Sequence, residues 1–294
     1  APTGITKAQR QAMSRRRGRY EVLVQDGVGR IRDTVSGEVM HSVNDPAVEA
    51  RTLYVEQSRL VERLGQAHDE PLVVWDVGLG SGANAMATLH AVEAMGAEAR
   101  RRRLVMVSFE NDLDSLQLAL KHPLWFQHLH HAAPQALLKH ERWTNAAGDI
   151  EWRLLPGDYA VRKHEAPAPD VVYYDPFSFR TDSDLWTLDE FRALARLCEA
   201  RATELFTYTN STQVRAAMLA AGLHVAKGRG TGPKSETTIG LSPLAAADTP
   251  HERLGLDWLA RWQRSDAQVP LGATGDEWRT AVLEHPQFRI VPTR

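Results

Sequence analysis

The stretch VVWDVGLGSGANA, residues 73–85, decides the fold. A hydrophobic run ends in Asp76, and a helical pattern begins near Asn84. Between them lie three glycines: Gly78, Gly80 and Gly82. Glycines let the backbone turn sharply and approach a bound molecule closely, and the helix N-terminus then offers free N–H groups. The pattern predicts the first β-α unit of a doubly wound sheet with a nucleotide-type cofactor at its switch point. A tight turn without a ligand is the alternative.

The glycine spacing is compatible with two classes of cofactor. Gly78, Gly80 and Ala83 fit the G-x-G-x-x-A fingerprint of dinucleotide-binding proteins. The glycines at 78, 80 and 82 also fit the tighter G-x-G-x-G spacing that methyltransferase cofactor loops use. A nicotinamide-dependent oxidoreductase therefore stays open at this point.

Carboxylates follow three further apolar runs. Glu110 ends LVMVSFE, where it could accept hydrogen bonds from both ribose hydroxyls of a nucleoside; a solvated strand-end carboxylate is the alternative. Asp158 follows LLPG and could accept a hydrogen bond from an adenine amino group, but Gly-Asp is also an ordinary turn pair. Asp175 ends DVVYYD and precedes Pro176 and Phe177. Its carboxylate could hold an amine N–H beside a ring that excludes water, or the element could be a simple turn.

The chain divides into three segments. Residues 1–68 form an N-terminal extension with a basic start, a β-hairpin around Asp26-Gly27, and a helix from about residue 45 to 64. Residues 69–242 alternate seven apolar runs with amphipathic runs, which predicts a mostly parallel sheet covered on both faces, its last two strands antiparallel. Residues 243–294 read as a Pro/Ala-rich linker followed by two amphipathic helices.

Composition indicates a globular enzyme-like chain. The 294 residues carry a formal net charge of -2, which gives no global argument for a polyanionic partner. The single cysteine, Cys198, lies in an apolar helical pattern and reads as an inert buried thiol. We find no run of 18 apolar residues and no secretory h-region, so we expect no membrane span and a cytoplasmic protein.

Basic and histidine-rich clusters read as structural or solvated. The runs Arg15–Arg17 and Arg100–Arg103 could neutralise phosphates, but solvated loop charge is the more frequent explanation. The histidines between residues 122 and 140 lack metal-ligand spacing with carboxylates, so we expect no metal.

The order of these motifs resembles the methyltransferase module of the MnmC/MnmD-type enzymes, which form 5-methylaminomethyl-2-thiouridine at the tRNA wobble position. The resemblance covers residues 40 to 240. It rests on MHS at 40–42, EARTLYVEQ at 49–57, DVGLGSGANA, SFE at 108–110, YYDPFSFRTDSDLWTLDEF, TYTNSTQVRAAMLAAGLHV and GRGTGPKSETTIG.

The resemblance implies a class I, Rossmann-like methyltransferase fold with seven strands, S-adenosylmethionine as methyl donor, and tRNA as substrate. It places Gly78, Gly80 and Gly82 under the methionine part of the cofactor, Glu110 at the ribose and Asp158 near the adenine. Asp76 and Asn84 belong to the same cofactor site. Asp175 orients the target amine with Phe177 as its catalytic neighbour, and Lys234 and Trp186 bind the substrate.

Two departures lie on the acceptor side. The family commonly has Asp-Gly-Phe-Ala-Pro where this chain has Asp175-Pro176-Phe177-Ser178-Phe179, and Lys-Arg-Glu-Met at positions 234–237, here KSET. A methyltransferase of a small-molecule or protein amine, or a non-catalytic binding protein of the same fold, therefore remains an alternative. No second glycine-rich fingerprint occurs, so we expect no flavin domain and a stand-alone methyltransferase.

Overall fold

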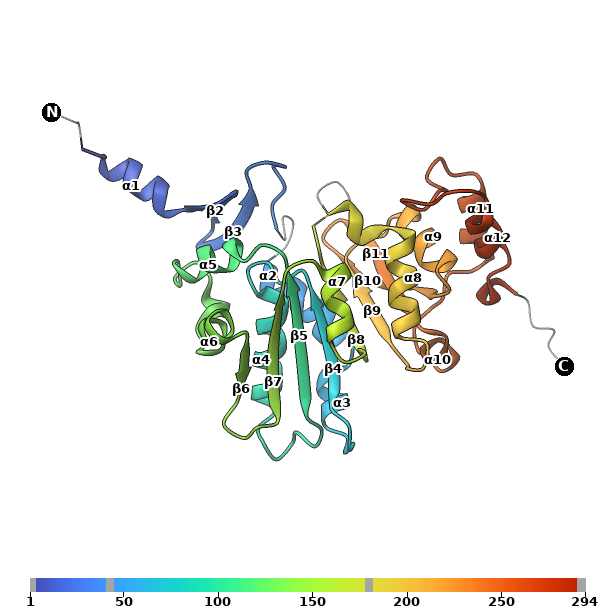
Figure 1. Ribbon diagram of the computed structural model, residues 1–294, viewed down its shortest axis with the longest axis horizontal. Coiled ribbons are helices and arrows are strands. Elements are labelled where there is room, and N and C mark those ends of the chain that lie inside the picture. Colours follow the sequence, from blue (N-terminus) through green and yellow to red (C-terminus); the bar gives the residue numbers. More distant parts are fainter. Residues whose placement is uncertain (1–3, 41–44, 178–181, 290–294) are drawn as a thin grey trace.

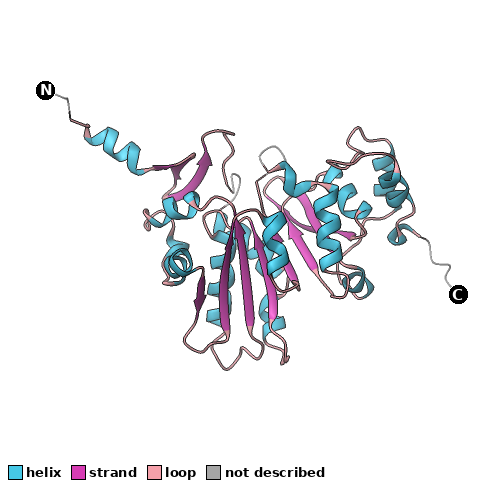
Figure 2. Ribbon diagram, in the orientation of Figure 1, coloured by secondary structure: helices cyan, strands magenta, loops and turns pink. Residues whose placement is uncertain are grey.

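An eight-stranded sheet lies at the centre of the computed structural model, which describes residues 4–40, 45–177 and 182–289. The strand order is β10-β11-β9-β8-β4-β5-β7-β6, and helices cover both faces (Figures 1 and 2). The strands are β4 (Leu72–Val77), β5 (Leu104–Glu110), β6 (Arg142–Thr144), β7 (Ile150–Pro156), β8 (Val171–Tyr174), β9 (Glu204–Thr207), β10 (His224–Thr231) and β11 (Lys234–Leu241).

The strand directions confirm the predicted class of sheet. Strands β7, β5, β4, β8 and β9 are parallel, and β11 runs antiparallel between β9 and β10. The prediction of seven strands missed β6, an antiparallel edge strand beside β7. Its three residues, Arg142 to Thr144, are exposed or half-buried, so they lack the apolar signal on which the prediction relied.

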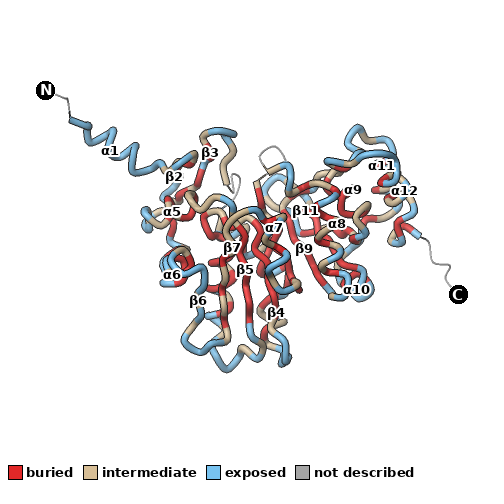
Figure 3. Tube along the Cα trace, in the orientation of Figure 1, coloured by how far each residue is buried: buried red, intermediate tan, exposed pale blue. Residues whose placement is uncertain are grey.

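Two apolar cores lie on the two faces of the sheet. In β4 every residue is buried because alternate side chains enter opposite cores, as is typical of central parallel strands (Figure 3). One face packs against α2 (Pro46–Ala50), the π-helix η1 (Arg51–Glu56), α3 (Leu60–Leu64), α4 (Ala83–Ala94), α5 (Asp114–Leu120), η2 (Gln127–Leu129), α6 (Ala133–His140) and α10 (Pro243–Ala247). The other packs against α7 (Tyr159–Arg162), η3 (Lys163–Glu165), η4 (Ser183–Trp186), α8 (Leu188–Leu197), α9 (Thr212–Ala220), α11 (Leu256–Gln263), α12 (Glu277–Leu283) and η5 (Pro286–Phe288).

The N-terminal extension contains the predicted hairpin. Helix α1 (Lys7–Ser14) precedes a small sheet of β1 (Arg16–Arg17), β2 (Tyr20–Gln25) and β3 (Val28–Asp33). The predicted helix over 45–64 begins at Pro46 as expected but is not continuous, because a π-helical turn and the left-handed Arg59 interrupt it. Here the buried amide of Gln57 donates to the Leu53 carbonyl (2.8 Å) and accepts from the Arg229 N–H (2.8 Å), which fastens the segment to β10.

The run Arg100–Arg103 lies directly before β5, at the edge of the sheet where the parallel strands begin. The side chain of Arg100 is 7% exposed and donates to Asp149 (2.8 Å), and Arg102 donates to the Glu70 carbonyl (3.0 Å). The interpretation as solvated loop charge was therefore wrong for these two arginines, whose partners are distant in the sequence.

In the described part of the chain, no helix is long and apolar enough to span a lipid bilayer.

The C-terminal segment packs on the second core. The predicted linker contains α10, which Ser242 caps, and the two predicted amphipathic helices correspond to α11 and α12. Trp262 is buried, stacks near Trp258 (6.5 Å between ring centroids) and meets the ring of Trp278 edge-on (6.2 Å).

We expect Trp262→Ala to lower the free energy of unfolding by about 3–5 kcal/mol, because it removes a large buried ring and leaves a cavity. Leu256→Ala, at a side chain that is 50% exposed on the same helix, is the matched control and should change stability by less than about 0.5 kcal/mol. Urea unfolding followed by circular dichroism measures both. Equal, small effects would show that α11 does not contribute to the core.

Candidate functional site

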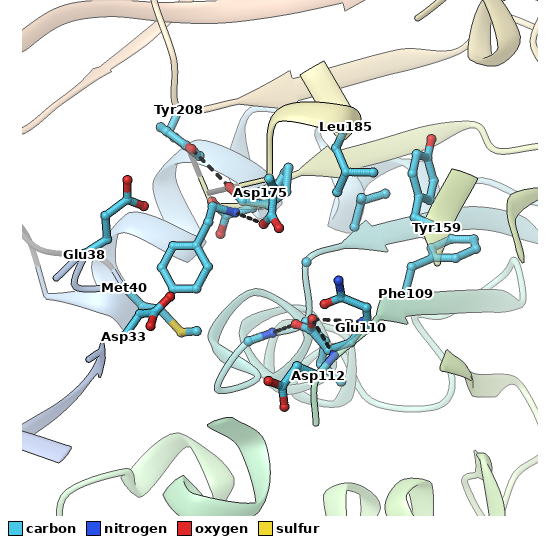
Figure 4. A pocket seen from close by; sticks show the side chains of 18 of the residues that line it. Asp33, Glu38, Met40, Phe109, Glu110, Asp112, Tyr159, Asp175, Leu185 and Tyr208 are labelled. Atoms are coloured by element: carbon cyan, nitrogen blue, oxygen red, sulfur yellow. Dashed lines mark hydrogen bonds between the residues drawn. The ribbon is translucent and has the colours of Figure 1, made fainter. Parts of the chain in front are cut away.

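A cavity of about 1130 Å³ lies at the carboxyl-end edge of the sheet, above the switch point between β4 and β8 (Figure 4). The chain leaves β4 toward β5 and β7 on one side and returns to β8 and β9 on the other, so the loops after β4 and β8 diverge there. The residues lining it include seven of the predicted site residues: Gly78, Gly80, Glu110, Asp158, Asp175, Phe177 and Lys234.

The glycine loop is shaped by the backbone that crosses it. A Cβ atom on Gly78 would lie 2.4 Å from the carbonyl oxygen of Asp175 and 2.9 Å from the Cα of Pro176, and the φ angle is +88°. Only glycine allows this close approach of the loops after β4 and β8. Gly82 starts α4 but lies off the cavity lining, where a Cβ atom would face Leu129 (3.3 Å).

Glu110 joins the glycine loop to the end of β5. Its Oε1 accepts the N–H of Gly80 (2.8 Å), and its Oε2 accepts the N–H groups of Asn111 (3.1 Å) and Asp112 (3.3 Å). Burial raises the pKa of Glu110 to about 7, although the bonds from Gly80 and Asp112 act in the opposite direction. Such a half-buried carboxylate, already oriented by backbone donors, can accept hydrogen bonds from the hydroxyl groups of a ligand in the cavity.

Asp175 is held by a residue on the neighbouring helix. Asn84, in the first turn of α4, donates its Nδ2–H to Oδ2 of Asp175 (2.7 Å). Asn84 is 3% exposed and does not line the cavity, so it acts on the site through Asp175. Burial and the charge of Asp175 both raise the pKa of the nearby Tyr54 and Tyr208. The carboxylate of Asp175 therefore lies beside two tyrosine hydroxyls that stay neutral, in a wall of the cavity that is largely shielded from water.

The loop after β8 is fixed by two further hydrogen bonds. The N–H of Phe177 donates to Asp182 (2.9 Å), and the indole of Trp186 donates to the Phe177 carbonyl (2.9 Å). Trp186 is buried, packs edge-on against Tyr174 and lies outside the cavity lining, so the structure does not place it for substrate contact. Spacing alone could not reveal that its ring points into the core. Ser178 and Phe179 of the predicted motif, like His41 and Ser42 of MHS, lie outside the described residues.

Asp76 does not reach the cavity either. It is fully buried and accepts a hydrogen bond from Ser108 (2.7 Å), whose hydroxyl in turn accepts the indole N–H of Trp152 (2.8 Å). Burial raises the pKa of Asp76 to about 6, against the effect of the Ser108 bond. Side chains alternate along β4, so a residue one step from the strand end enters the core. We assign Asp76 to a polar connection between β4, β5 and β7.

Asp158 and Lys234 lie on opposite walls. Asp158 caps α7 by accepting the N–H of Ala160 (3.0 Å), and its side chain is exposed on the cavity wall. Both predicted readings of this residue, turn and ligand contact, are thus compatible with its position. Lys234 donates to the Tyr208 carbonyl (3.2 Å) and stands 5.3 Å from that ring, and burial lowers its pKa.

The N-terminal segment forms a wall of the cavity that was not predicted from the sequence. Arg19 donates to both carboxylate oxygens of Asp33 (2.9 and 2.6 Å), and both residues line the cavity with Tyr20 and Met40. Burial alone would raise the pKa of Asp33, but the bonds from Arg19 and the Val35 N–H outweigh it and lower that pKa. In the sequence, the MHS motif that begins at Met40 was the one feature of residues 19–40 that the family resemblance included.

Acidic groups dominate the cavity lining. Among the described residues that line it, two are basic, Arg19 and Lys234, and nine are acidic: Asp33, Glu38, Glu49, Glu110, Asp112, Asp158, Asp175, Asp182 and Asp184. Such a lining attracts cationic groups and repels phosphates. Within the described residues, no group of three or more His, Cys, Asp and Glu side chains is arranged to hold a metal ion.

The raised pKa of Glu110 predicts a pH-dependent stability. Its ionised form is disfavoured in the folded chain, so the free energy of unfolding should fall as pH rises from 4.5, its ordinary value, to about 7. Glu110→Gln removes this ionisation. We expect the variant to gain about 1–3 kcal/mol relative to the unsubstituted chain between pH 4 and pH 8. Urea unfolding at both pH values measures it; Glu98→Gln, on the exposed surface, is the control. If the free energy of unfolding changed with pH in the same way in Glu110→Gln and in the unsubstituted chain, the raised pKa of Glu110 would be contradicted.

Comparisons with known proteins agree with this geometry. Residues 121–243 match a family model described as S-adenosyl-L-methionine-dependent methyltransferase. The chain is similar to the tRNA 5-methylaminomethyl-2-thiouridine biosynthesis bifunctional protein MnmC of Aeromonas salmonicida (strain A449), at 29% identity over 79% of this chain and 36% of that protein. It is also similar to the protein of that name from Pseudomonas putida (strain W619), at 30% identity over 80% and 36%. The chain thus spans about a third of the length of these relatives.

A solved structure shares the fold. The crystal structure of MnmC2 from Aquifex aeolicus superposes with a TM-score of 0.64 at 20% identity, covering 90% of this chain and 82% of that one. The glycine loop, the strand order and the family match together settle the cofactor class left open by the spacing of the glycines, in favour of S-adenosylmethionine. Residues 121–243 therefore match the S-adenosyl-L-methionine-dependent methyltransferases, and the chain shares its fold with the MnmC2 structure.

Proposed function

We propose that this protein methylates the exocyclic amine of an aminomethylated wobble uridine in tRNA. The observation that carries the proposal is the carboxylate of Asp175, which Asn84 holds at 2.7 Å on the wall of an acidic cavity beside the glycine loop. The names of the relatives supply the substrate: the product in those names carries a methylamino group, so its precursor is an amine.

The cavity fits S-adenosylmethionine. We propose that the backbone at Gly78 and Gly80 supports its methionine part, that Glu110 accepts its ribose hydroxyls, and that Asp158 lies near its adenine. Glu110 suits this role because its carboxylate is buried enough for its pKa to rise to about 7, yet opens on the cavity. When bound, the cofactor supplies an electrophilic methyl group on a cationic sulfur, and the acidic lining complements that charge.

Asp175 acts on the amine. An amine must be unprotonated to attack, and an acidic cavity favours its ammonium form, so the site needs a group that accepts a proton. The carboxylate of Asp175 can accept an N–H of the amine, which aims the nitrogen lone pair away from the carboxylate and stabilises positive charge as it develops. Phe177 and Tyr208 exclude water from this corner of the cavity, and the Tyr208 hydroxyl donates to the Pro176 carbonyl (3.0 Å) to hold the loop.

The three segments share this work. We propose that residues 69–242 form the methyltransferase domain and that 1–68 complete the cavity through the hairpin. Residues 243–294 support the second core. An enzyme that acts on tRNA would work in the cytoplasm.

The acceptor is tested directly with labelled S-adenosylmethionine. We expect methyl transfer to tRNA that carries the aminomethyl group and none to tRNA already methylated there. Nuclease digestion and mass spectrometry locate the label on the wobble uridine. Transfer to free small amines or to protein amines, with none to tRNA, would instead identify another acceptor for the same catalytic site.

Asp175→Ala tests the role of the carboxylate. We expect turnover at saturating cofactor to fall by about 10²- to 10⁴-fold, the usual contribution of a positioned acid or base, while cofactor affinity in calorimetry changes little. Asp184→Ala, an exposed carboxylate on the same cavity wall, is the control and should retain most activity. Lost cofactor binding with normal turnover at saturation would refute this assignment.

A further inference from the structure

Two stretches without acidic residues lie side by side at one end of the molecule. Residues 4–20 contain six Lys or Arg and no Asp or Glu, and residues 115–140 contain two lysines and five histidines, again with no Asp or Glu. The first forms α1 and β1, and the second includes most of α5 and all of α6. These elements are neighbours at the end of the molecule opposite α11 and α12 (Figure 1).

Specific contacts join the two stretches. The ring of His122 bonds to the Ser14 carbonyl (2.8 Å), and the guanidinium of Arg15 stands 4.7 Å over the ring of Trp125. The ring of His122 also stacks on the ring of Trp125, with 5.0 Å between the ring centroids. Helix α1 itself buries no residue, so its polar surface stays available to solvent. The two stretches are therefore in contact, and we call them together the basic face; within it Arg16 approaches Glu21 (4.0 Å) and Arg17 pairs with Asp114 (2.9 Å).

A hollow of about 370 Å³ lies in this face. Arg17, Lys121 and Lys139 line it together with the amides of Gln117 and Gln135. Arg17 is paired with Asp114 (2.9 Å), whereas neither lysine forms an ion pair within the described ranges, and both are exposed. Unpaired cations and amide donors around a hollow are the groups that bind phosphate oxygens.

The basic face and the acidic cavity adjoin each other. Arg17, in β1, lines the hollow, and Arg19, in the turn between β1 and β2, lines the cavity. Phosphates are repelled by the cavity lining and attracted to the face beside it. We propose that the sugar-phosphate backbone of the RNA acceptor binds along the face formed by residues 4–20 and 115–140, with phosphates at Lys121 and Lys139. This inference rests on the proposed tRNA substrate.

The variant Lys121→Ala/Lys139→Ala tests the surface. Each lost phosphate contact lowers the slope of log affinity against log salt by about 0.7 to 0.9. We expect tRNA binding, followed by fluorescence anisotropy between 50 and 200 mM KCl, to weaken about tenfold at the lowest salt and to lose about 1.4 to 1.8 from that slope. Cofactor affinity by calorimetry should be unchanged, because neither lysine lines the cavity.

Arg261→Ala/Arg264→Ala is the matched control, since it removes two exposed cations from α11 and its end, far from this face (Figure 1). Equal weakening by both double variants would overturn the inference, because net charge would then explain it. Unchanged binding by the lysine variant, with tight binding by the unsubstituted chain, would overturn the inference and leave the tRNA proposal standing. No binding of tRNA by the unsubstituted chain would overturn the proposed acceptor and this surface together. If the lysine variant lost binding to phosphatidylserine vesicles but kept its binding to tRNA, the face would be a membrane contact, and the inference would be overturned.

Discussion

The close approach of two loops at the switch point controls the geometry of the site. Gly78, after β4, packs against the backbone of Asp175 and Pro176, after β8, at a distance that no side chain would allow. This contact brings the start of α4 beside the loop after β8, and Asn84 can then donate to Asp175. The same loop carries Gly80, whose N–H reaches Glu110 on β5. One backbone contact therefore positions carboxylates from two other strands.

Burying several carboxylates together is unfavourable unless donors or a ligand compensate. The structure supplies part of that compensation: backbone N–H groups for Glu110 and Asp182, an amide for Asp175 and a guanidinium for Asp33. These donors do not fully compensate for burial, because burial still raises the pKa values of Glu110 and Asp182. A cationic cofactor and an amine acceptor would relieve this penalty, so the electrostatic cost in the free protein becomes binding energy for ligands of positive charge.

Charge is separated over the surface although the chain is nearly neutral as a whole. A formal net charge of -2 hides an acidic cavity and an adjacent basic face. For the proposed tRNA acceptor this division would be favourable, because the phosphate backbone and the reacting amine need opposite surroundings. The small N-terminal sheet lies at the border and contributes to both, through Arg17 in β1 and Arg19 in the turn that follows it.

Local patterns in the chain determined the order of elements and the position of the site. Apolar runs of strand length, the glycines at 78, 80 and 82, and carboxylates at 110, 158 and 175 marked the carboxyl edge of a parallel sheet, because periodicity and turn chemistry depend on neighbouring residues. The direction of individual side chains depends on packing instead. Asp76 and Trp186 point into cores, and Asn84 reaches the site only through Asp175. Pairs distant in sequence, such as Arg100 with Asp149, and the meeting of residues 4–20 with 115–140, arise only when the folded chain brings remote segments together. That is why the tertiary structure alone decided the walls of the cavity and the basic face beside it.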